Sequence, residues 1–447
     1  MKNILTRFTL PALLLAWICS PVYAKQNISL QEAFEIALQN NHAIKMEQIA
    51  REQAANNVFR GNAGLLPTLD LVGSAEISIE DANLEIADYD ETPPRISSIS
   101  VDQSESRTYN AAIQLNYTLF DGFRGRYTYR QLQSQDRSAR INKQIAIENT
   151  LLDVANAYLE LLRQTERMEL QEQNLSVSKD RLGRASEARR LGKATERDLL
   201  NAEVNYNADL IEHASAKVDR KAAARDLIFL LGSDQFADDL QPAGEIEVNN
   251  ELDRERLLQN ALNNNSALML AEERKKSAEF ARNVVTADRY PRISLSSSYG
   301  YFRQEQDASN LPFIETRGVT GGITLSYSIF SGGQRSRAIQ NADLDIRSSQ
   351  EQKQRVRNEI HKEISNTYSR YANAIRQLEL SELNTKTAEK NFENSRDAFS
   401  RGQITSIELR EAQLNLLNEN LRKKDLRYRA KQGELLLLVL SGTLMEE

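Results

Sequence analysis

Residue types that carry chemistry are scarce in this chain. Its one cysteine, Cys19, lies close to the N-terminus, and its three histidines, His42, His213 and His361, are far apart. No disulfide, thiol nucleophile or histidine-based metal site is therefore expected. The glycine motif of phosphate-binding loops and the nucleophile elbow of hydrolases are also missing. The sequence predicts no catalytic residue, no cofactor and no metal site, and so it does not predict an enzyme.

Long apolar runs are missing beyond the first residues. Met1–Ala24 carries two cations, one apolar run and a small-residue end, which is the pattern of a secretory signal peptide. The run falls short of the roughly 20 residues of a membrane anchor. Trp17 and Ile18 stand where a lipoprotein signal has small residues, so Cys19 is not expected to carry lipid. Loss of the two cations changes the formal charge from −6 to −8, which leaves no general basic surface for nucleic acid.

Proline is absent from two long segments. Gly125–Arg190 and Arg335–Arg401 are predicted to be continuous helices, because proline interrupts helices and neither segment contains one. At 1.5 Å per residue each helix would be about 100 Å long, far more than a globular domain needs. After a glycine, a second helix is expected to run back beside each: these are Thr195–Leu231 and Ser406–Leu440.

The first long helix has an apolar seam with residues spaced three and four apart, as in coiled coils. Its members are Ile147, Leu151, Val154, Tyr158, Leu161, Met168, Leu175 and Leu182. Thr165, Glu172 and Lys179 interrupt the seam. The pattern favours a helical wall that faces water on one side.

Four shorter segments alternate apolar and polar residues. They are Thr68–Ile79, Thr108–Phe120, Arg292–Phe302 and Gly318–Phe330. A period of two over about ten residues, with aromatics near the ends, is typical of transmembrane β-barrel strands. A soluble sandwich with one wet face is the alternative, but two hairpins are too few to build one. Four strands also cannot close a barrel alone, so several chains must contribute.

The two faces of these strands have different expected environments. The mid-strand apolar residues that would contact lipid are Ile113, Leu115, Ile323 and Leu325. Their neighbours Gln114 and Thr324 would face the lumen.

The residues between the first two strands, Glu80–Arg107, are polar and acidic and are predicted to form a solvated loop. Asp81, Asp88, Asp90 and Glu91 in this loop have the chemistry to hold a cation. They lack, however, the glycine-centred turn of a calcium site.

The order short helices, two strands, long helix and returning helix occurs twice. An offset of 210 residues aligns Phe120 with Phe330, Tyr158 with Tyr368, and Gly192 with Gly402. The short helices are expected at Ser29–Asn40 and about Ala43–Gly64, then at Asp253–Leu262 and onward to about Asp288. The resulting division is a signal peptide at 1–24, a first repeat at 25–232, a linker at 233–250, a second repeat at 251–442 and a tail at 443–447.

The two glycine turns carry the most specific motifs, LGKATERDLLNAE at Leu191–Glu203 and RGQITSIELREAQ at Arg401–Gln413. With the strand-end motifs YTLFDGFRGR and YSIFSGGQRSR, they resemble the TolC family of outer-membrane efflux and secretion channels. The resemblance implies a mixed α/β membrane protein that is a homotrimer in the outer membrane. Each chain would give four strands to a β-barrel, and its helices to an α-helical coiled-coil tunnel that crosses the periplasm.

The resemblance also implies a function and partners. The protein would be the exit duct of a tripartite efflux pump or a type I secretion system, with a periplasmic adaptor and an inner-membrane pump as partners. Cargo would be chosen by the pump, so drugs, metal ions and secreted polypeptides all remain open. A periplasmic coiled-coil adaptor is the alternative, although an adaptor would not carry duplicated strand hairpins.

Candidate site residues follow from the resemblance alone. The adaptor-docking turns correspond to Gly192, Lys193, Gly402 and Gln403. The acidic pore constriction corresponds to Glu408, Glu411 and Asp198. The family's tyrosine and arginine that hold the closed state appear here as Phe399 and Ile404, which cannot form that lock, and Arg197 or Arg410 would have to replace it.

Overall fold

The computed structural model describes residues 27–88, 90, 95–233, 236, 240–244, 246–307 and 313–444. The predicted signal peptide, Pro93-Pro94 and Glu91 of the predicted acidic loop, and the last residues of the tail lie outside this range. The chain forms two compact units. The helical unit comprises residues up to 42, 150–250 and 370–434, and the sheet unit comprises 43–149, 251–369 and 435 onward. Each unit contains parts of both halves of the sequence, because the long helices pass from one unit to the other.

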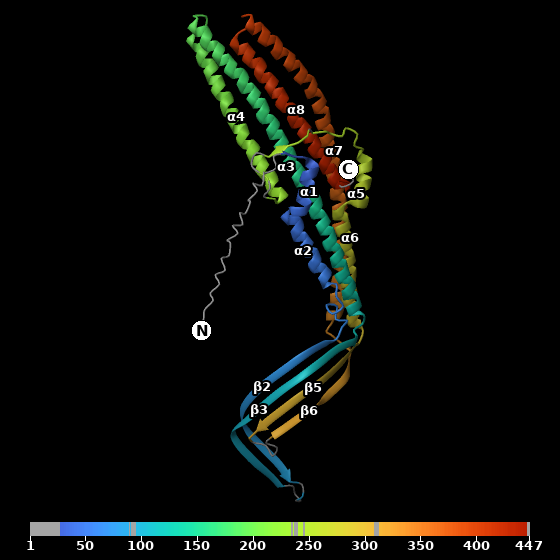
Figure 1. Cartoon of the computed structure of the whole chain (residues 1–447). Coiled ribbons are helices and arrows are strands. Elements are labelled where there is room, and N and C mark those ends of the chain that lie inside the picture. The colour runs from blue at the N-terminus through green and yellow to red at the C-terminus, as the bar shows by residue number, and fades with distance from the viewer. Residues whose placement is uncertain are drawn as a thin grey trace, which may run out of the picture. The chain divides into compact units, whose positions relative to one another are not determined.

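The long helices have the expected bounds to within one residue at each end (Figure 1). They are α3 (Arg124–Arg190), α4 (Glu196–Leu231), α7 (Gln334–Ser400) and α8 (Ser406–Ser441). Helices α3 and α7 both have 67 residues, and α4 and α8 both have 36. Equal lengths in the two halves are what a duplicated sequence predicts. No helix among the described residues is both long and apolar enough to cross a membrane.

Four shorter helices precede the strands of the two halves. They are α1 (Leu30–Asn40), α2 (His42–Asn57), α5 (Arg254–Asn264) and α6 (Ser266–Thr286), which a short 3₁₀ turn η1 (Ala287–Arg289) extends. The prediction that α2 reaches Gly64 is wrong. The Asn57 carbonyl accepts hydrogen bonds from the Phe59 amide (2.8 Å) and the Asn62 side chain (3.2 Å), so the chain turns there instead of continuing the helix.

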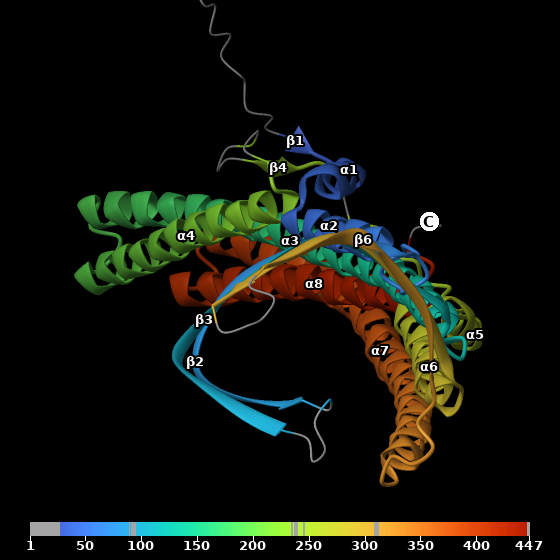
Figure 2. The same cartoon turned by 90° about the horizontal axis from the view of Figure 1, so that it is seen from below.

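The helical unit has an apolar core beside a two-stranded parallel sheet of β1 (Asn27–Ile28) and β4 (Gln241–Pro242). Figure 2 shows this small sheet next to α1. The core joins Ile28 to α1, α3 and α4, and includes Val154, Tyr158 and Leu161 of the predicted seam. Toward the C-terminal end of α3 the buried residues become polar: Gln164, Gln171, Asn174, Ser178 and Arg181. Met168, Leu175 and Leu182 are only partly buried. In this half of the predicted seam, polar residues are therefore more deeply buried than the apolar seam residues.

The sheet unit contains one antiparallel sheet in the order β2-β3-β5-β6. Its strands are β2 (Thr68–Asp88), β3 (Arg95–Phe120), β5 (Arg292–Gln306) and β6 (Phe313–Ser326). Strand β6 ends four residues before the predicted Phe330, because no described strand pairs with residues 327–330. The outer edges of β2 and β6 have no neighbouring strand among the described residues.

The predicted loop at Glu80–Arg107 is largely an extension of the β2–β3 hairpin. Glu80 pairs with Ser104 and Asn83 with Ser100, with an irregularity between these pairs. There Gln103 has a φ of 55°, and its amide donates to the Asp81 carboxylate at 2.8 Å. Pairing satisfies the backbone groups that a loop would leave to water, which explains the correction. Strand β5 stops at Gln306, so none of the described strands pairs with the outer part of the hairpin except β2 and β3 themselves.

Candidate functional site

The two predicted docking turns have the same backbone geometry. Gly192 has a φ of 70° and Gly402 a φ of 72°, in the left-handed region where a side chain costs energy. The amide of Lys193 donates to the Ala188 carbonyl at 2.8 Å, and the Gly192 amide donates to the Arg189 carbonyl at 2.9 Å. This pair of bonds is the Schellman motif, which closes the C-terminal end of a helix.

The second turn repeats this arrangement residue by residue. Gln403 donates to the Ala398 carbonyl and Gly402 to that of Phe399, both at 2.9 Å. Phe399 and Ile404 are partly buried and carry no charge, as their residue types dictate. Both turns lie in the helical unit, and the side chains of Lys193 and Gln403 are exposed.

Two of the three predicted pore carboxylates cap helices. Thr195 and Asp198 form a capping box at the start of α4: the threonine amide and hydroxyl donate to the aspartate at 3.0 and 2.7 Å. Thr405 and Glu408 do the same at the start of α8, at 2.6 and 2.8 Å. In each box the carboxylate residue's own amide donates back to the threonine hydroxyl.

These hydrogen bonds favour the charged carboxylates. The Thr195 hydroxyl and then its amide lower the pKa of Asp198, and the Thr405 amide and then its hydroxyl lower the pKa of Glu408. The sequence reasoning missed this capping role. A threonine followed three residues later by an acid, just before an apolar helical pattern, is the signal that would have found it. Glu411, the third predicted carboxylate, is exposed one turn farther along α8.

A buried ion pair joins α8 to α4 behind the turns. Both terminal nitrogens of Arg410 donate to the two carboxylate oxygens of Asp209, at 2.6 and 2.7 Å. The Asp209 side chain is 5% exposed and that of Arg410 is 13% exposed. Ser178 on α3 donates to Asp209 and accepts a 3.2 Å bond from Arg410. Three helices therefore meet at this pair.

A second arginine extends the polar contact. Arg181 on α3 donates to the Gln413 side chain at 3.0 Å and to the Ser406 hydroxyl at 3.3 Å. Gln413 in turn donates to the Asn174 side-chain oxygen at 2.6 Å. Burial, followed by the nearby charge of Arg410, lowers the pKa of Arg181 to about 10. The two helical hairpins are thus held together here by polar bonds where most helix pairs use apolar packing.

Arg410 was one of two arginines proposed to replace the missing lock, and it does bind a carboxylate. Its partner Asp209 was not predicted. Asp209 occupies a row of buried α4 residues spaced seven apart, whose other members are Ala202, Ala216 and Ala223. An acid in an otherwise alanine row is a signal for a buried partner, and the sequence analysis did not use it.

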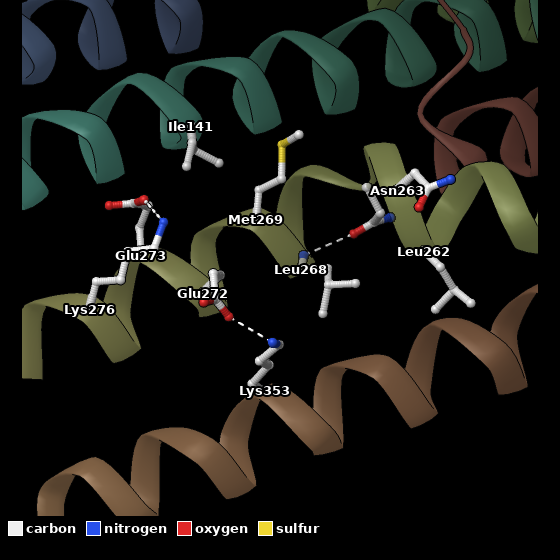
Figure 3. A pocket seen from close by; sticks show the side chains of 10 residues that line it. Ile141, Leu262, Asn263, Leu268, Met269, Glu272, Glu273, Lys276 and Lys353 are labelled. Atoms are coloured by element: carbon white, nitrogen blue, oxygen red, sulfur yellow. Dashed lines mark hydrogen bonds and ion pairs between the residues drawn. The ribbon is translucent and has the colours of Figure 1, made fainter. Parts of the chain in front are cut away.

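A separate cavity lies in the sheet unit. It has a volume of about 400 Å³ and lies between α3, α5, α6 and α7 (Figure 3). Its lining includes Ile141 and Met269, and Glu272, which also lines it, forms an ion pair with Lys353 at 2.7 Å. Glu273 binds Lys276, also at 2.7 Å. Among the described residues, no three histidine, cysteine or acidic side chains are grouped to hold a metal ion.

The chain thus combines a four-stranded antiparallel sheet, with no described strand beside either outer edge, and duplicated long helical hairpins. The model of the outer membrane efflux protein family matches residues 33–233 and 257–443, and the chain belongs to this family. It is therefore an outer-membrane exit duct for efflux or secretion, and the adaptor alternative is wrong.

The chain is similar to known proteins and to solved structures over nearly its whole length. The proteases secretion protein PrtF of Dickeya chrysanthemi is 21% identical over 94% of this chain and 90% of its own length. The outer membrane protein TolC of Vibrio cholerae is 21% identical over 100% and 97%. The Campylobacter jejuni CmeC outer membrane channel has a TM-score of 0.74 at 18% identity, covering 93% of this chain and 86% of its own. VceC from Vibrio cholerae has a TM-score of 0.72 at 18% identity, covering 92% and 96%.

Proposed function

We propose that three copies of this chain assemble into one outer-membrane channel that continues as a helical tunnel into the periplasm. The observation that carries the proposal is the four-stranded sheet with two unpaired edges. A sheet in a bilayer must close, because unpaired backbone groups have no water there to bond. Three chains with four strands each would supply a closed barrel in which β6 of one copy pairs with β2 of the next.

The residues after β6 support this pairing. Tyr327, Ile329 and Phe330 are 53%, 88% and 86% exposed, an unusual state for large apolar side chains. Their sequence continues the alternation of β6, which ends where its only described neighbour, β5, begins at Arg292. A partner strand on the open edge would extend β6 through these residues, to the length that the sequence predicts.

The sheet has the two faces that a barrel in lipid requires. Cross-strand partners place Leu71, Ile113, Tyr299 and Val319 in one row on the same face. The neighbouring row on the opposite face is Val72, Ala112, Gly300 and Gly318, and the next is Asp70, Gln114, Ser298 and Thr320. In this register the predicted lipid-facing residues Ile113, Leu115, Ile323 and Leu325 share one face, and Gln114 and Thr324 share the other.

The proposal predicts a detergent-dependent trimer. Purified residues 25–447 should remain in solution only with detergent, and should migrate as a trimer on an unheated gel and as a monomer after boiling. Light scattering in detergent measures the mass independently. A monomer that is soluble without detergent would contradict the proposed assembly.

We also propose that the turns at Gly192 and Gly402 dock a periplasmic adaptor that links the duct to an inner-membrane pump. The turns project main chain and the side chains of Lys193 and Gln403 beyond the helices. Relatives include both the alkaline protease secretion protein AprF of Pseudomonas aeruginosa and the outer membrane efflux protein BepC of Brucella suis. The proposal therefore covers secretion and efflux alike.

Near these turns, three copies of Glu408, Glu411 and Asp198 would line the narrowest part of the tunnel. We predict that a multivalent cation added from the periplasmic side blocks single channels in planar bilayers, because converging carboxylates attract cations. The Glu408 carboxylate already accepts hydrogen bonds from Thr405 at the start of α8, whereas Glu411 is exposed and free to bind a cation. Glu411→Gln should therefore relieve more of the block than Glu408→Gln. The double variant should relieve most of the block while trimers still form.

Asp198→Asn is the matched control for a capping acid in the first half, and should relieve less block than Glu411→Gln. Equal block in wild type and in the Glu408→Gln, Glu411→Gln double variant would show that these carboxylates do not line the pore.

A further inference from the structure

On β3, β5 and β6 the apolar residues of one sheet face are followed by two parallel rows of charge, while on β2 the cross-strand partners of Arg107 and Glu105 are Ile77 and Ile79. Arg107 on β3, Arg303 on β5 and Arg317 on β6 form one diagonal row, each shifted by two residues relative to its neighbour strand. Glu105, Glu305 and Glu315 form a second row on the same strands and the same face. In every strand the glutamate lies two residues farther from the helices than the arginine.

Each arginine is ordered by its own strand. Arg107 and Glu105 lie 2.5 Å apart, Arg317 and Glu315 2.9 Å apart, and Arg303 also binds Glu305. The guanidinium groups remain accessible, since the side chains of Arg107, Arg303 and Arg317 are 48%, 42% and 68% exposed. A guanidinium has five N–H donors, so one glutamate leaves several of them free.

Aromatic rings lie against two of these groups. The Arg317 guanidinium lies 5.1 Å from the centre of the Tyr301 ring, and that of Arg303 lies 5.1 Å from the Phe313 ring. Stacking uses the face of the guanidinium and leaves its in-plane donors available for a bidentate oxyanion. Tyr109 and Tyr299 on the same face are 41% and 61% exposed. Aromatic residues of this kind mark the water–lipid interface of membrane proteins.

The height of the arginine row fits that interface. Ile293 is the first outward residue of β5, and Arg303 lies ten residues farther along the strand. At 3.4 Å per residue and a tilt of about 40°, this separation is about 26 Å across the membrane, close to the roughly 25 Å apolar band of such barrels. On β3, β5 and β6 the order along the face is then apolar side chains, arginines and glutamates.

We propose that the arginine row binds the phosphate groups of phosphorylated lipid headgroups in the leaflet at this end of the strands, an inference that rests on the proposed barrel. The sequence of groups on the protein matches that of such a lipid: hydrocarbon against the apolar rows, phosphate against the arginines, and the hydrated polar part against the glutamates. Bidentate arginine–phosphate contacts supply specificity for phosphate over a neutral headgroup. The outward face stays free when edges β2 and β6 pair with neighbouring copies, so assembly does not cover the site.

The test compares lipids on the purified wild-type trimer in detergent. Lipid A with two phosphates and the same lipid after enzymatic removal of its phosphates are added in separate samples. Native mass spectrometry counts the retained lipids, and heating measures the temperature at which trimers dissociate. We expect severalfold more retention and a higher dissociation temperature with the phosphorylated lipid. Equal retention of the two lipids by wild type would overturn the proposal without any variant.

A triple variant locates the site. Arg107→Gln, Arg303→Gln and Arg317→Gln together should abolish the difference between the two lipids, while the matched control Arg355→Gln, Arg357→Gln and Arg396→Gln on α7 should retain it. An unchanged difference in the first variant would overturn the assignment to this row. Inorganic phosphate at the same concentration should not stabilise the trimer, and stabilisation equal to that of the lipid would overturn a lipid source. Failure of wild type to form trimers at all would instead contradict the proposed function.

Discussion

Leu115→Arg is expected to prevent trimers from accumulating, whereas Gln114→Arg, one residue away, should leave them intact. Leu115 pairs with Leu69 and Ser297 on the face that carries the apolar rows. An arginine near the bilayer midplane costs roughly 2–4 kcal/mol, so three copies would cost about 6–12 kcal/mol per channel. Gln114 pairs with Asp70 and Ser298 on the polar face, where an added cation lies beside a carboxylate and water.

The measurement is the amount of trimer in isolated outer membranes, read on unheated gels with total protein as the reference. Leu325→Arg and Thr324→Arg on β6 form a second matched pair with the same expected ranking, because Leu325 is opposite Ile293 and Thr324 opposite Ser294. The reverse ranking in either pair would mean that the faces of the sheet are inverted.

Strand faces could be predicted because a period of two is local information. The register and the length of the strands were harder to predict, since they depend on which strands pair with each other. The outer β2–β3 hairpin was predicted as a loop because its acidic residues suggested solvent, yet pairing between Glu80 and Ser104 continues the ladder. Residues 327–330 show the opposite case: their pattern predicts a strand, but no described strand of this chain lies on that edge to pair with them.

Helix bounds were predictable where the sequence carries a stop signal. Gly192 and Gly402 follow α3 and α7, and both adopt the left-handed conformation that such a signal implies. Helix α2 ends at Asn57 without a glycine or a proline there. Hydrogen bonds from the Phe59 amide and the Asn62 side chain to the Asn57 carbonyl form the turn instead. The first proline that follows in the sequence is Pro67, so the end of α2 was predicted too late, at Gly64.

The candidate site was predictable only in part. Its turns belong to continuous sequence motifs, and so do the capping boxes that the motif search overlooked. The Arg410–Asp209 pair joins residues 201 positions apart in different halves of the chain. No local pattern in one sequence connects them. The polar residues buried along α3 were likewise hidden, because a heptad of glutamine, asparagine and serine looks like an exposed helix face.

Disrupting the Arg410–Asp209 pair is expected to loosen the contact between the two helical hairpins and to raise the mean conductance of the channel. Removing one partner leaves the other charge buried, which typically costs about 3–5 kcal/mol per pair. Asp209→Asn should be more severe than Arg410→Gln, because it leaves Arg410 beside the buried Arg181 without their shared carboxylate. Hydrogen exchange at the start of α4 and single-channel recordings in planar bilayers measure the two effects.

Arg190→Gln is the matched control, because Arg190 also lies next to a turn and binds Glu187, but in an exposed pair that contributes little. Asp209→Leu combined with Arg410→Leu removes both charges, and should restore slower exchange and lower conductance relative to either single variant. If Arg410→Gln has no more effect than Arg190→Gln, the buried pair does not hold the hairpins together. If the double leucine variant has the same mean conductance and exchange rate as Asp209→Asn, the loosening comes from lost packing, because no unpaired charge of this pair remains.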